Sequence, residues 1–181
     1  MIQKLCSFIF HSLLGWKVDP FPDKKQYVMI VAPHTSNWDF IIGLFARGTV
    51  NVQLSFLAKS QLFKFPWGSF FRYVGGISVD RSQSNKLVDQ IAENFHNDPN
   101  FKLVLTPEGT RRSVNKWKSG FHYIAQAAQV PIVPVGLDFK HKHMIVGEPF
   151  MPTAELSETL EKIQKFYEDV QGKHPQGLPK I

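Results

Sequence analysis

Residues 26–39, QYVMIVAPHTSNWD, join an apolar run to a short polar loop and then to the start of a helical pattern. The apolar run has the length and the composition of a buried β-strand. Pro33 and His34 follow at the end of this strand, and Asn37 can cap a helix that begins at Trp38. A buried strand that leads into a helix is the building unit of an α/β fold.

The rest of the chain repeats this alternation of strand-like and helical segments. Apolar runs of strand length occupy residues 52–58, 77–79, 101–105, 132–136 and, more weakly, 144–146. Helical patterns occupy residues 38–47, 61–65, 67–73, 84–96, 120–129 and 154–170. Strands separated by helices predict mainly parallel pairing. We therefore expect one layered α/β domain over residues 1–181, with a mainly parallel mixed sheet flanked by helices and without a repeat, linker or second domain.

The two ends of the chain depart from this alternation. Residues 2–16 (IQKLCSFIFHSLLGW) predict a short amphipathic helix that Gly15 ends. This helix either lies in a membrane interface or packs on the domain, because both arrangements bury the same apolar face. No uninterrupted apolar stretch approaches the ~20 residues of a membrane-spanning helix, and no signal-peptide cleavage site follows the first run. Residues 172–181 are expected to form a loose tail.

The composition narrows the class of protein without naming a partner. Of the 181 residues, 43% are hydrophobic and 20% are charged, which excludes global disorder. The net charge of +6 favours polyanions, namely nucleic acid, anionic lipid headgroups or phosphorylated substrates. Basic residues are spread along the chain, so charge alone does not separate these partners. The single cysteine, Cys6, excludes an intramolecular disulfide and indicates a reducing compartment.

The loop after the first predicted strand carries a candidate for chemistry. Ligands of open α/β sheets bind beyond the carboxyl ends of the strands, where His34 is expected to lie. Asp39 falls in the first turn of the next helix, where the helix dipole favours a carboxylate. A carboxylate on one ring nitrogen fixes the tautomer and leaves the other nitrogen free to accept a proton. The pair is therefore a candidate dyad for activating a substrate hydroxyl, with a capping aspartate beside a loop histidine as the structural alternative.

Four short blocks of sequence occur in one order along the chain. Residues 34–39 read HTSNWD, residues 75–81 read GGISVDR, residues 107–111 read PEGTR and residues 130–135 read VPIVPV. They resemble the H-x4-D motif, the glycine-led second block, the P-E-G-T-R motif and the V-P-I-x-P-V strand of the glycerolipid acyltransferase superfamily. That superfamily includes 1-acylglycerol-3-phosphate and glycerol-3-phosphate acyltransferases, and the resemblance spans over half of the chain.

The resemblance implies a glycerol-3-phosphate acyltransferase-like fold and O-acylation of a lysophosphatidic acid-like acceptor in phospholipid biosynthesis. It implies that His34 deprotonates the acceptor hydroxyl and that Asp39 orients His34. The hydroxyl would attack the thioester of acyl-CoA or acyl-carrier protein without a covalent acyl-enzyme, a metal or another cofactor. Another lyso-lipid acceptor, such as a lyso-aminolipid, is the close alternative.

The second and third blocks also carry the residues expected to bind substrate. Arg81 and Arg111 each offer a planar fork to phosphate oxygens, and Lys59 adds a point charge. Glu108 is expected either to hold Arg111 in place or to accept a hydrogen bond from a glycerol hydroxyl. Ordinary ion pairs at a strand end and within a loop are the structural alternatives for these charged residues.

The Gly109 turn is expected to bring Thr110 and backbone N–H groups close to a ligand. The tetrahedral oxyanion of acyl transfer needs such hydrogen-bond donors. Backbone N–H groups near Gly109 or near residues 130–131 are the candidates that the sequence offers.

Residues 63–73 (FKFPWGSFFRY) combine aromatic and basic side chains as interfacial segments do. We expect this segment to contact a membrane or to line an acyl tunnel, with a place in the core as the alternative. Peripheral attachment to the cytoplasmic face of a membrane is therefore expected, without a nucleic-acid partner. His141 and His143 lack an acidic or cysteine ligand at metal-binding spacing, so we expect surface histidines rather than a metal site.

Two alternatives come from other classes of protein. A basic module that binds lipid or nucleic acid without catalysis has no use for a positioned base such as His34. A thioesterase would use His34 to activate water, but it has no use for cations that suit a phosphorylated acceptor. Acyl transfer is favoured over both.

Overall fold

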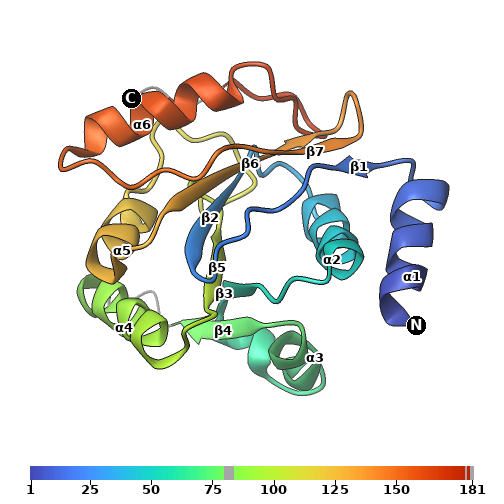
Figure 1. Ribbon diagram of the computed structural model, residues 1–181, viewed down its shortest axis with the longest axis horizontal. Helices are drawn as coiled ribbons and strands as arrows, with labels where there is room; N and C mark the ends of the chain where they lie inside the picture. The colour runs from blue at the N-terminus through green and yellow to red at the C-terminus, as the bar shows by residue number, and fades with distance from the viewer. Residues whose placement is uncertain (80–83, 178, 180–181) are drawn as a thin grey trace.

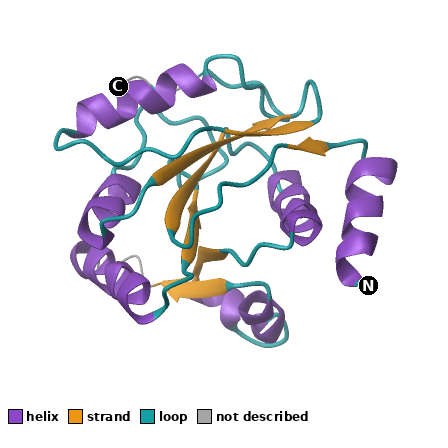
Figure 2. Ribbon diagram, in the orientation of Figure 1, coloured by secondary structure: helices purple, strands orange, loops and turns teal. Residues whose placement is uncertain are grey.

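In the computed structural model, residues 1–79, 84–177 and 179 are described and form one sheet with helices on both faces (Figure 1 and Figure 2). The strands are β1 (Lys17–Val18), β2 (Tyr27–Ala32), β3 (Ser55–Lys59), β4 (Gly76–Val79), β5 (Lys102–Leu105), β6 (Ile132–Asp138) and β7 (His143–Val146). The helices are α1 (Ile2–Ser7), the π-helical η1 (Phe8–Leu13), α2 (Trp38–Val50), the 3-10 helix η2 (Ser60–Phe63), α3 (Gly68–Tyr73), α4 (Ser84–Asn97), α5 (Gly120–Ala128) and α6 (Leu156–Tyr167).

The strands follow the order β1-β7-β6-β2-β5-β3-β4 across the sheet. Neighbouring strands are parallel, except that β6 and β7 are antiparallel. The prediction of an α/β domain with a mainly parallel mixed sheet flanked by helices is confirmed. β2 lies between β5 and β6, with Val28 opposite both Leu103 and Ile132. The loop that carries His34 therefore leaves the sheet from a central strand.

β2 was recognisable in the sequence because both of its faces are covered. Alternate residues of a strand point to opposite faces. Val28 and Ile30 join the core beneath α4, α5 and α6, whereas Tyr27 and Met29 join the core beneath α2. A strand buried on both faces reads as a continuous apolar run.

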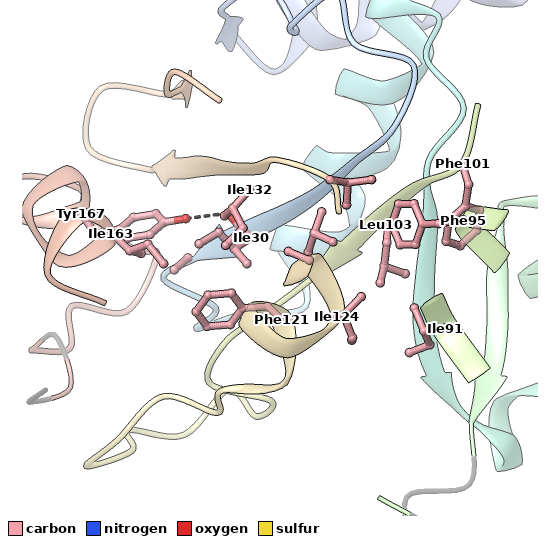
Figure 3. Packing of buried hydrophobic residues seen from close by; sticks show 14 of the residues in the cluster. Ile30, Ile91, Phe95, Phe101, Leu103, Phe121, Ile124, Ile132, Ile163 and Tyr167 are labelled. Atoms are coloured by element: carbon pink, nitrogen blue, oxygen red, sulfur yellow. Dashed lines mark hydrogen bonds between the residues drawn. The ribbon is translucent and has the colours of Figure 1, made fainter. Parts of the chain in front are cut away.

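The helices close one hydrophobic core on each face of the sheet. Figure 1 shows α1 and α2 on one side, with α4 and α5 on the other. Figure 3 shows the core beneath α4, α5 and α6, in which Phe95 packs edge-on against Phe101 at a ring separation of 4.7 Å. In the core of the opposite face, Ile42 of α2 and Phe10 of η1 are buried.

Tyr167 of α6 links two central strands through its hydroxyl group, and Figure 3 shows its bond to Ile30. The hydroxyl donates to the Ile30 carbonyl of β2 at 2.6 Å and accepts from the Val135 amide of β6 at 3.1 Å. The register places Ile30 opposite Pro134, which has no N–H group to donate. Tyr167 thus supplies a bridge between β2 and β6 beside a proline in a central strand.

The N-terminal segment packs on the domain and also exposes apolar side chains. The side chain of Cys6 in α1 lies against α2, where a Cβ on Gly48 would come within 2.5 Å of the Cys6 sulfur. Ile2, Leu5 and Phe8 are exposed. Both arrangements that the sequence left open, packing on the domain and presenting an apolar face outward, are therefore compatible with this helix.

One strand was missed by the sequence prediction, and several elements begin or end at other residues than predicted. β1 was not predicted, because two residues that pair with β7 carry no periodic pattern. α2 continues to Val50 and ends at Asn51 in a left-handed conformation, so β3 begins only at Ser55 rather than at residue 52. α6 is shorter than the predicted 154–170 at both ends.

The described part of the predicted loose tail lies against the domain. The backbone amide of His174 donates to Thr35 Oγ1 at 3.2 Å, and the Gln164 side chain donates to the Pro179 carbonyl at 2.8 Å. Among the described residues, no helix is long and apolar enough to cross a membrane.

Candidate active site

The predicted catalytic loop lies at the carboxyl edge of the sheet. β2 ends at Ala32, residues 33–37 form the loop, and α2 begins at Trp38. Because β5 and β6 run parallel to β2, the segments that follow Leu105 and Asp138 reach the same edge. This is the edge at which ligands of parallel α/β sheets bind.

His34 and Asp39 form a hydrogen-bonded pair, as their spacing predicts. His34 Nδ1 lies 2.9 Å from Asp39 Oδ2. The side chain of His34 is 24% exposed, whereas that of Asp39 is only 3% exposed. With Nδ1 bonded to a carboxylate, the neutral imidazole carries its proton there, and Nε2 is left to accept a proton.

The loop backbone holds the Asp39 carboxylate. Asp39 Oδ2 accepts from the amide of Thr35 at 2.8 Å and from the amide of Ser36 at 2.9 Å. The helix dipole of α2 also favours a negative charge in its first turn. Asp39 Oδ1 is buried, and within the described residues it has no hydrogen-bond partner. The carboxylate is thus fixed by one oxygen, which it presents to His34.

Glu108 fixes the backbone of the catalytic residue. Its Oε1 accepts from the backbone amide of His34 at 3.1 Å. Burial raises the pKa of the Glu108 carboxyl, and hydrogen bonds from the amides of Glu108 and His34 oppose this shift. Across the described part of the chain, Glu108 forms no ion pair with Arg111 and its Oε2 has no partner. The structure therefore gives Glu108 a contact with the His34 backbone and no ion pair with Arg111, the first of its two expected partners, whereas a bond to a glycerol hydroxyl stays a prediction.

A large, mainly apolar cavity of about 750 Å³ adjoins the pair. One face of α2 lines it, with Asp39, Gly43 and Arg47 spaced four residues apart. These positions span about 12 Å along the helix. His34 also lines the cavity, so the catalytic pair adjoins a mainly apolar space with the volume of a small-molecule site.

Two of the three cationic residues of the predicted substrate site, Lys59 and Arg111, lie at the same edge. Lys59 ends β3 and is exposed, and Arg111 is exposed in the loop after β5. Arg81 lies outside the described residues. Lys118, which the sequence prediction did not include, lines the cavity. A Cβ at Gly109 would lie 2.9 Å from Lys118 Nζ, so the absent side chain leaves room for this ammonium group.

The turn at Gly109 has the conformation that its sequence predicts. Gly109 adopts a positive φ of 62°, which few residues other than glycine tolerate. It lines the cavity, and its amide donates to the Thr106 carbonyl at 3.0 Å. Thr110 Oγ1 accepts from the Arg112 amide at 3.4 Å. Gly109 and Thr106 line the cavity, whereas Thr110 and Arg112 do not.

The prediction that backbone N–H groups near residues 130–131 donate to the oxyanion is wrong. The Pro131 carbonyl accepts from Val28 at the start of β2, so residues 130–131 lie at the opposite edge of the sheet from His34. Six strand residues separate these edges by about 20 Å. The Val130 amide donates to the Ala125 carbonyl, and Pro131 has no N–H group.

His141 of the β6–β7 turn and His143 at the start of β7 each pair with an aspartate. His141 Nδ1 lies 2.5 Å from Asp138 Oδ2, and His143 Nε2 lies 2.8 Å from Asp19 Oδ1. No group of three or more potential metal ligands occurs among the residues that the structure describes.

The comparison with known proteins agrees with this geometry. A sequence model of the Acyltransferase family matches residues 17–138. The chain is 32% identical over 120 residues to a 1-acyl-sn-glycerol-3-phosphate acyltransferase of Streptococcus pneumoniae, which covers 65% of this chain and 44% of that protein. It is 31% identical over 133 residues to the Escherichia coli enzyme of the same name, covering 68% and 53% respectively. The chain thus spans about half the length of these curated relatives.

A solved structure supports the fold. The crystal structure of the 1-acyl-sn-glycerophosphate acyltransferase from Thermotoga maritima superposes with a TM-score of 0.62 at 18% identity, covering 95% of this chain and 80% of that one. The family match covers more than half of the chain, and it agrees with the four sequence blocks. The chain therefore belongs to the Acyltransferase family, and the predicted membership of the glycerolipid acyltransferases is confirmed.

Proposed function

We propose that the protein transfers a fatty acyl group from acyl-CoA or acyl-carrier protein to a hydroxyl of a lysophosphatidic acid-like acceptor, with His34 as general base. The observation that carries this proposal is the His34–Asp39 hydrogen bond beside an apolar cavity that both residues line. A positioned base beside an apolar space suits a reaction between a hydroxyl and a fatty acyl thioester. The names of the relatives add support for a lysophosphatidic acid acceptor.

In this mechanism Nε2 of His34 takes the proton of the acceptor hydroxyl as its oxygen attacks the thioester carbon. Asp39 stabilises the imidazolium that forms. The tetrahedral intermediate collapses, the carbon–sulfur bond breaks, and the departing thiolate takes the proton from His34. The products are an ester and a free thiol, without a metal or another cofactor in any step.

The cavity along α2 is the place that we assign to an acyl chain. A Cβ built on Gly43 meets nothing within 4 Å, so a larger side chain there would occupy cavity space. Gly43→Leu should shift the preferred acyl donor to shorter chains, as measured with acyl-CoA of graded length. Gly177→Leu is the control, because Gly177 is exposed and also meets nothing within 4 Å. An unchanged chain-length profile in Gly43→Leu would place the chain elsewhere.

The acceptor phosphate is assigned to Lys59 and Arg111 at the carboxyl edge, joined by Lys118 and by Arg81, whose position lies outside the described residues. Arg111→Ala should raise KM for lysophosphatidic acid about tenfold or more, because hydrogen bonds to charged groups contribute about 1.5–3 kcal/mol. KM for the acyl donor should change little. Arg112→Ala is the matched control, since this neighbouring arginine is also exposed. A change confined to donor KM would reassign Arg111 to the donor.

A membrane surface is proposed as the source of the acceptor, with the protein peripheral on the cytoplasmic face. Exposed apolar side chains occur on α1, at the start of η1 and around α3, including Phe8, Phe65 and Trp67. Figure 1 places α1 and α3 on the α2 side of the sheet. Such aromatic residues beside lysine and arginine are typical of interfacial segments.

Point substitutions test this surface better than removal of residues 2–16, because Phe10 and Trp16 belong to the core. Phe8→Ser together with Trp67→Ser should lower co-sedimentation with vesicles that contain anionic lipid. Tyr123→Ser, an exposed aromatic change on α5, should leave it unchanged. Equal binding of all variants would contradict the interfacial assignment.

One assay distinguishes the proposed reaction from its alternatives. The parent protein is incubated with labelled acyl-CoA or acyl-carrier protein and, in separate reactions, with lysophosphatidic acid, a lyso-aminolipid or no acceptor. We expect ester formation with lysophosphatidic acid. Fast thioester loss without an acceptor would indicate a thioesterase, and transfer only to the lyso-aminolipid would change the acceptor. No turnover with any of them would leave only a binding role.

A further inference from the structure

The chain after α6 returns to the edge of the sheet that carries the candidate active site. Residues 171–176, which we name the C-terminal strap, make hydrogen bonds to several of the segments at this edge. The amide of Phe139, just beyond β6, donates to the Gln171 carbonyl at 2.8 Å. The amide of His174 donates to Thr35 Oγ1 at 3.2 Å. The strap therefore joins the end of β6 to the catalytic loop.

The strap also reaches the first turn of α2 and the loop after β5. Lys173 Nζ lies 5.1 Å from the ring centre of Trp38, within the range of a cation–π contact. Gln176 Nε2 donates to the Arg111 carbonyl at 3.2 Å. One short segment thus contacts both flanks of the catalytic loop and the loop of the P-E-G-T-R block.

Gly172 of the strap packs closely against the catalytic loop. A Cβ on Gly172 would lie 2.9 Å from both Oγ1 and Cγ2 of Thr35 and 3.0 Å from Cγ of Pro33. Side-chain carbons essentially never approach so closely in folded proteins, so a larger residue here must displace the Thr35 side chain or the Pro33 ring of this loop. Gly172 is buried, which places the contact inside the domain rather than at its surface.

Thr35 connects this contact to the catalytic pair. Its amide donates to Asp39 Oδ2 at 2.8 Å, and that same oxygen is the partner of His34 Nδ1 at 2.9 Å. The Thr35 side chain faces the strap while its backbone holds the carboxylate. A displacement of Thr35 would therefore alter the position of Asp39 and, through it, the orientation of the His34 imidazole.

We propose that the C-terminal strap is a positioning element for the reaction. The close packing of Gly172 holds Thr35 in place, so that the Thr35 amide keeps Asp39 and His34 in their catalytic arrangement. The role of His34 in this inference rests on the proposed function, whereas the strap contact itself does not. Gly172 touches no reacting atom, and its effect passes through Thr35.

The kinetic test compares Gly172→Ala with Gly177→Ala, a control whose added Cβ meets nothing within 4 Å. Misplacement of a catalytic group by about 1 Å can lower the rate about 100-fold, so we expect kcat of Gly172→Ala to fall between about 10- and 100-fold. KM for both substrates should stay close to the parent values. Gln176→Ala, which removes one strap contact without adding bulk, should lower kcat in the same direction by less.

A second substitution tests whether the effect passes through Thr35. Thr35→Ser removes the Cγ2 that the added methyl group would meet and keeps the oxygen that accepts from His174. We therefore expect Thr35→Ser to restore part of the kcat lost in Gly172→Ala. Parent-like kcat in Gly172→Ala, or no restoration in the double variant, would overturn the proposal.

Amide hydrogen exchange measured by NMR tests the contact without any assay of activity. In Gly172→Ala the amides of Thr35 and Ser36 should exchange about tenfold faster, while the amide of Met29 in β2 keeps its parent rate. Unchanged exchange at Thr35 and Ser36, or equal acceleration throughout β2, would overturn positioning by the strap. If the parent transfers no acyl group, the proposed function fails and this exchange pattern still decides the strap.

Discussion

Two buried tyrosines should respond differently to loss of the hydroxyl group. Tyr27 in β2 and Tyr167 in α6 are both 0% exposed. The Tyr167 hydroxyl bonds to Ile30 and Val135, whereas the Tyr27 hydroxyl has no hydrogen-bond partner among the described residues. The substitution of Phe for Tyr removes the same atom at both sites, so the difference isolates the value of the bridge between β2 and β6.

The expected magnitudes follow from these contacts. A net contribution of about 1 kcal/mol for each hydrogen bond, with a further penalty for the carbonyl and amide left buried, gives about 2–4 kcal/mol for Tyr167→Phe. Tyr27→Phe removes a buried hydroxyl that gains no hydrogen bond in return. The free energy of unfolding of the Tyr27→Phe variant should therefore stay within about 0.5 kcal/mol of the parent value or exceed it by about 1 kcal/mol.

Urea unfolding at equilibrium measures both changes. The midpoint of Tyr167→Phe should fall with an unchanged m-value, because the surface exposed on unfolding is the same. Tyr123→Phe is the control for an exposed tyrosine. Equal losses of stability in Tyr27→Phe and Tyr167→Phe would refute the assignment of the Tyr167 bridge.

Three further predictions concern the site and the core. Asp39→Asn keeps an oxygen for the amides of Thr35 and Ser36 but removes the charge that stabilises the imidazolium, so kcat should fall about 10²- to 10⁴-fold with a parent-like circular dichroism spectrum; a parent-like kcat would contradict the dyad. Burial raises the pKa of Glu108, so the folded protein binds a proton that the unfolded chain releases above its ordinary pKa of about 4.3, and stability falls as pH rises through that window. Glu108→Gln should remove this loss of stability with pH. The urea midpoint of Glu108→Gln should therefore exceed that of the parent by more at about pH 8 than at about pH 4. A difference in midpoint that shrinks as pH rises would contradict the raised pKa. Ile163→Ala, at a fully buried position, should cost about 2–5 kcal/mol in urea unfolding, and a loss below about 1 kcal/mol would mean that the core beneath α6 is loosely packed.

Local patterns in the sequence were sufficient for the parts of the fold and the site that depend on neighbours along the chain. β2 is apolar throughout because two faces cover it, and the spacing of His34 and Asp39 brings a strand end beside the first turn of a helix. The positive φ of Gly109 could be predicted because glycine adopts this conformation more readily than other residues. The His34–Asp39 contact and the Gly109 turn each join residues close along the chain, so the local pattern contains them, whereas for β2 the pattern indicates burial without indicating which helices cover the strand.

These local patterns could not predict contacts between segments that are far apart in the sequence. The bond from the His34 amide to Glu108 joins residues 74 positions apart, and the bond from His174 to Thr35 joins residues 139 positions apart. Glu108 was predicted to be part of the site from its motif, but its partner depends on how β2 and β5 align. The strap was predicted as a loose tail, because its glycine and polar residues are typical of tails and only packing against Pro33 and Thr35 gives them a role.

The central claim is that His34 accepts the proton of the acceptor hydroxyl, and one rate measurement tests it most directly. Transfer of labelled acyl groups to lysophosphatidic acid is compared between the parent, His34→Ala and His96→Ala, a control at an exposed histidine of α4. We predict that His34→Ala lowers kcat about 10²- to 10⁴-fold while His96→Ala keeps the parent rate. A parent-like rate in His34→Ala would contradict the claim.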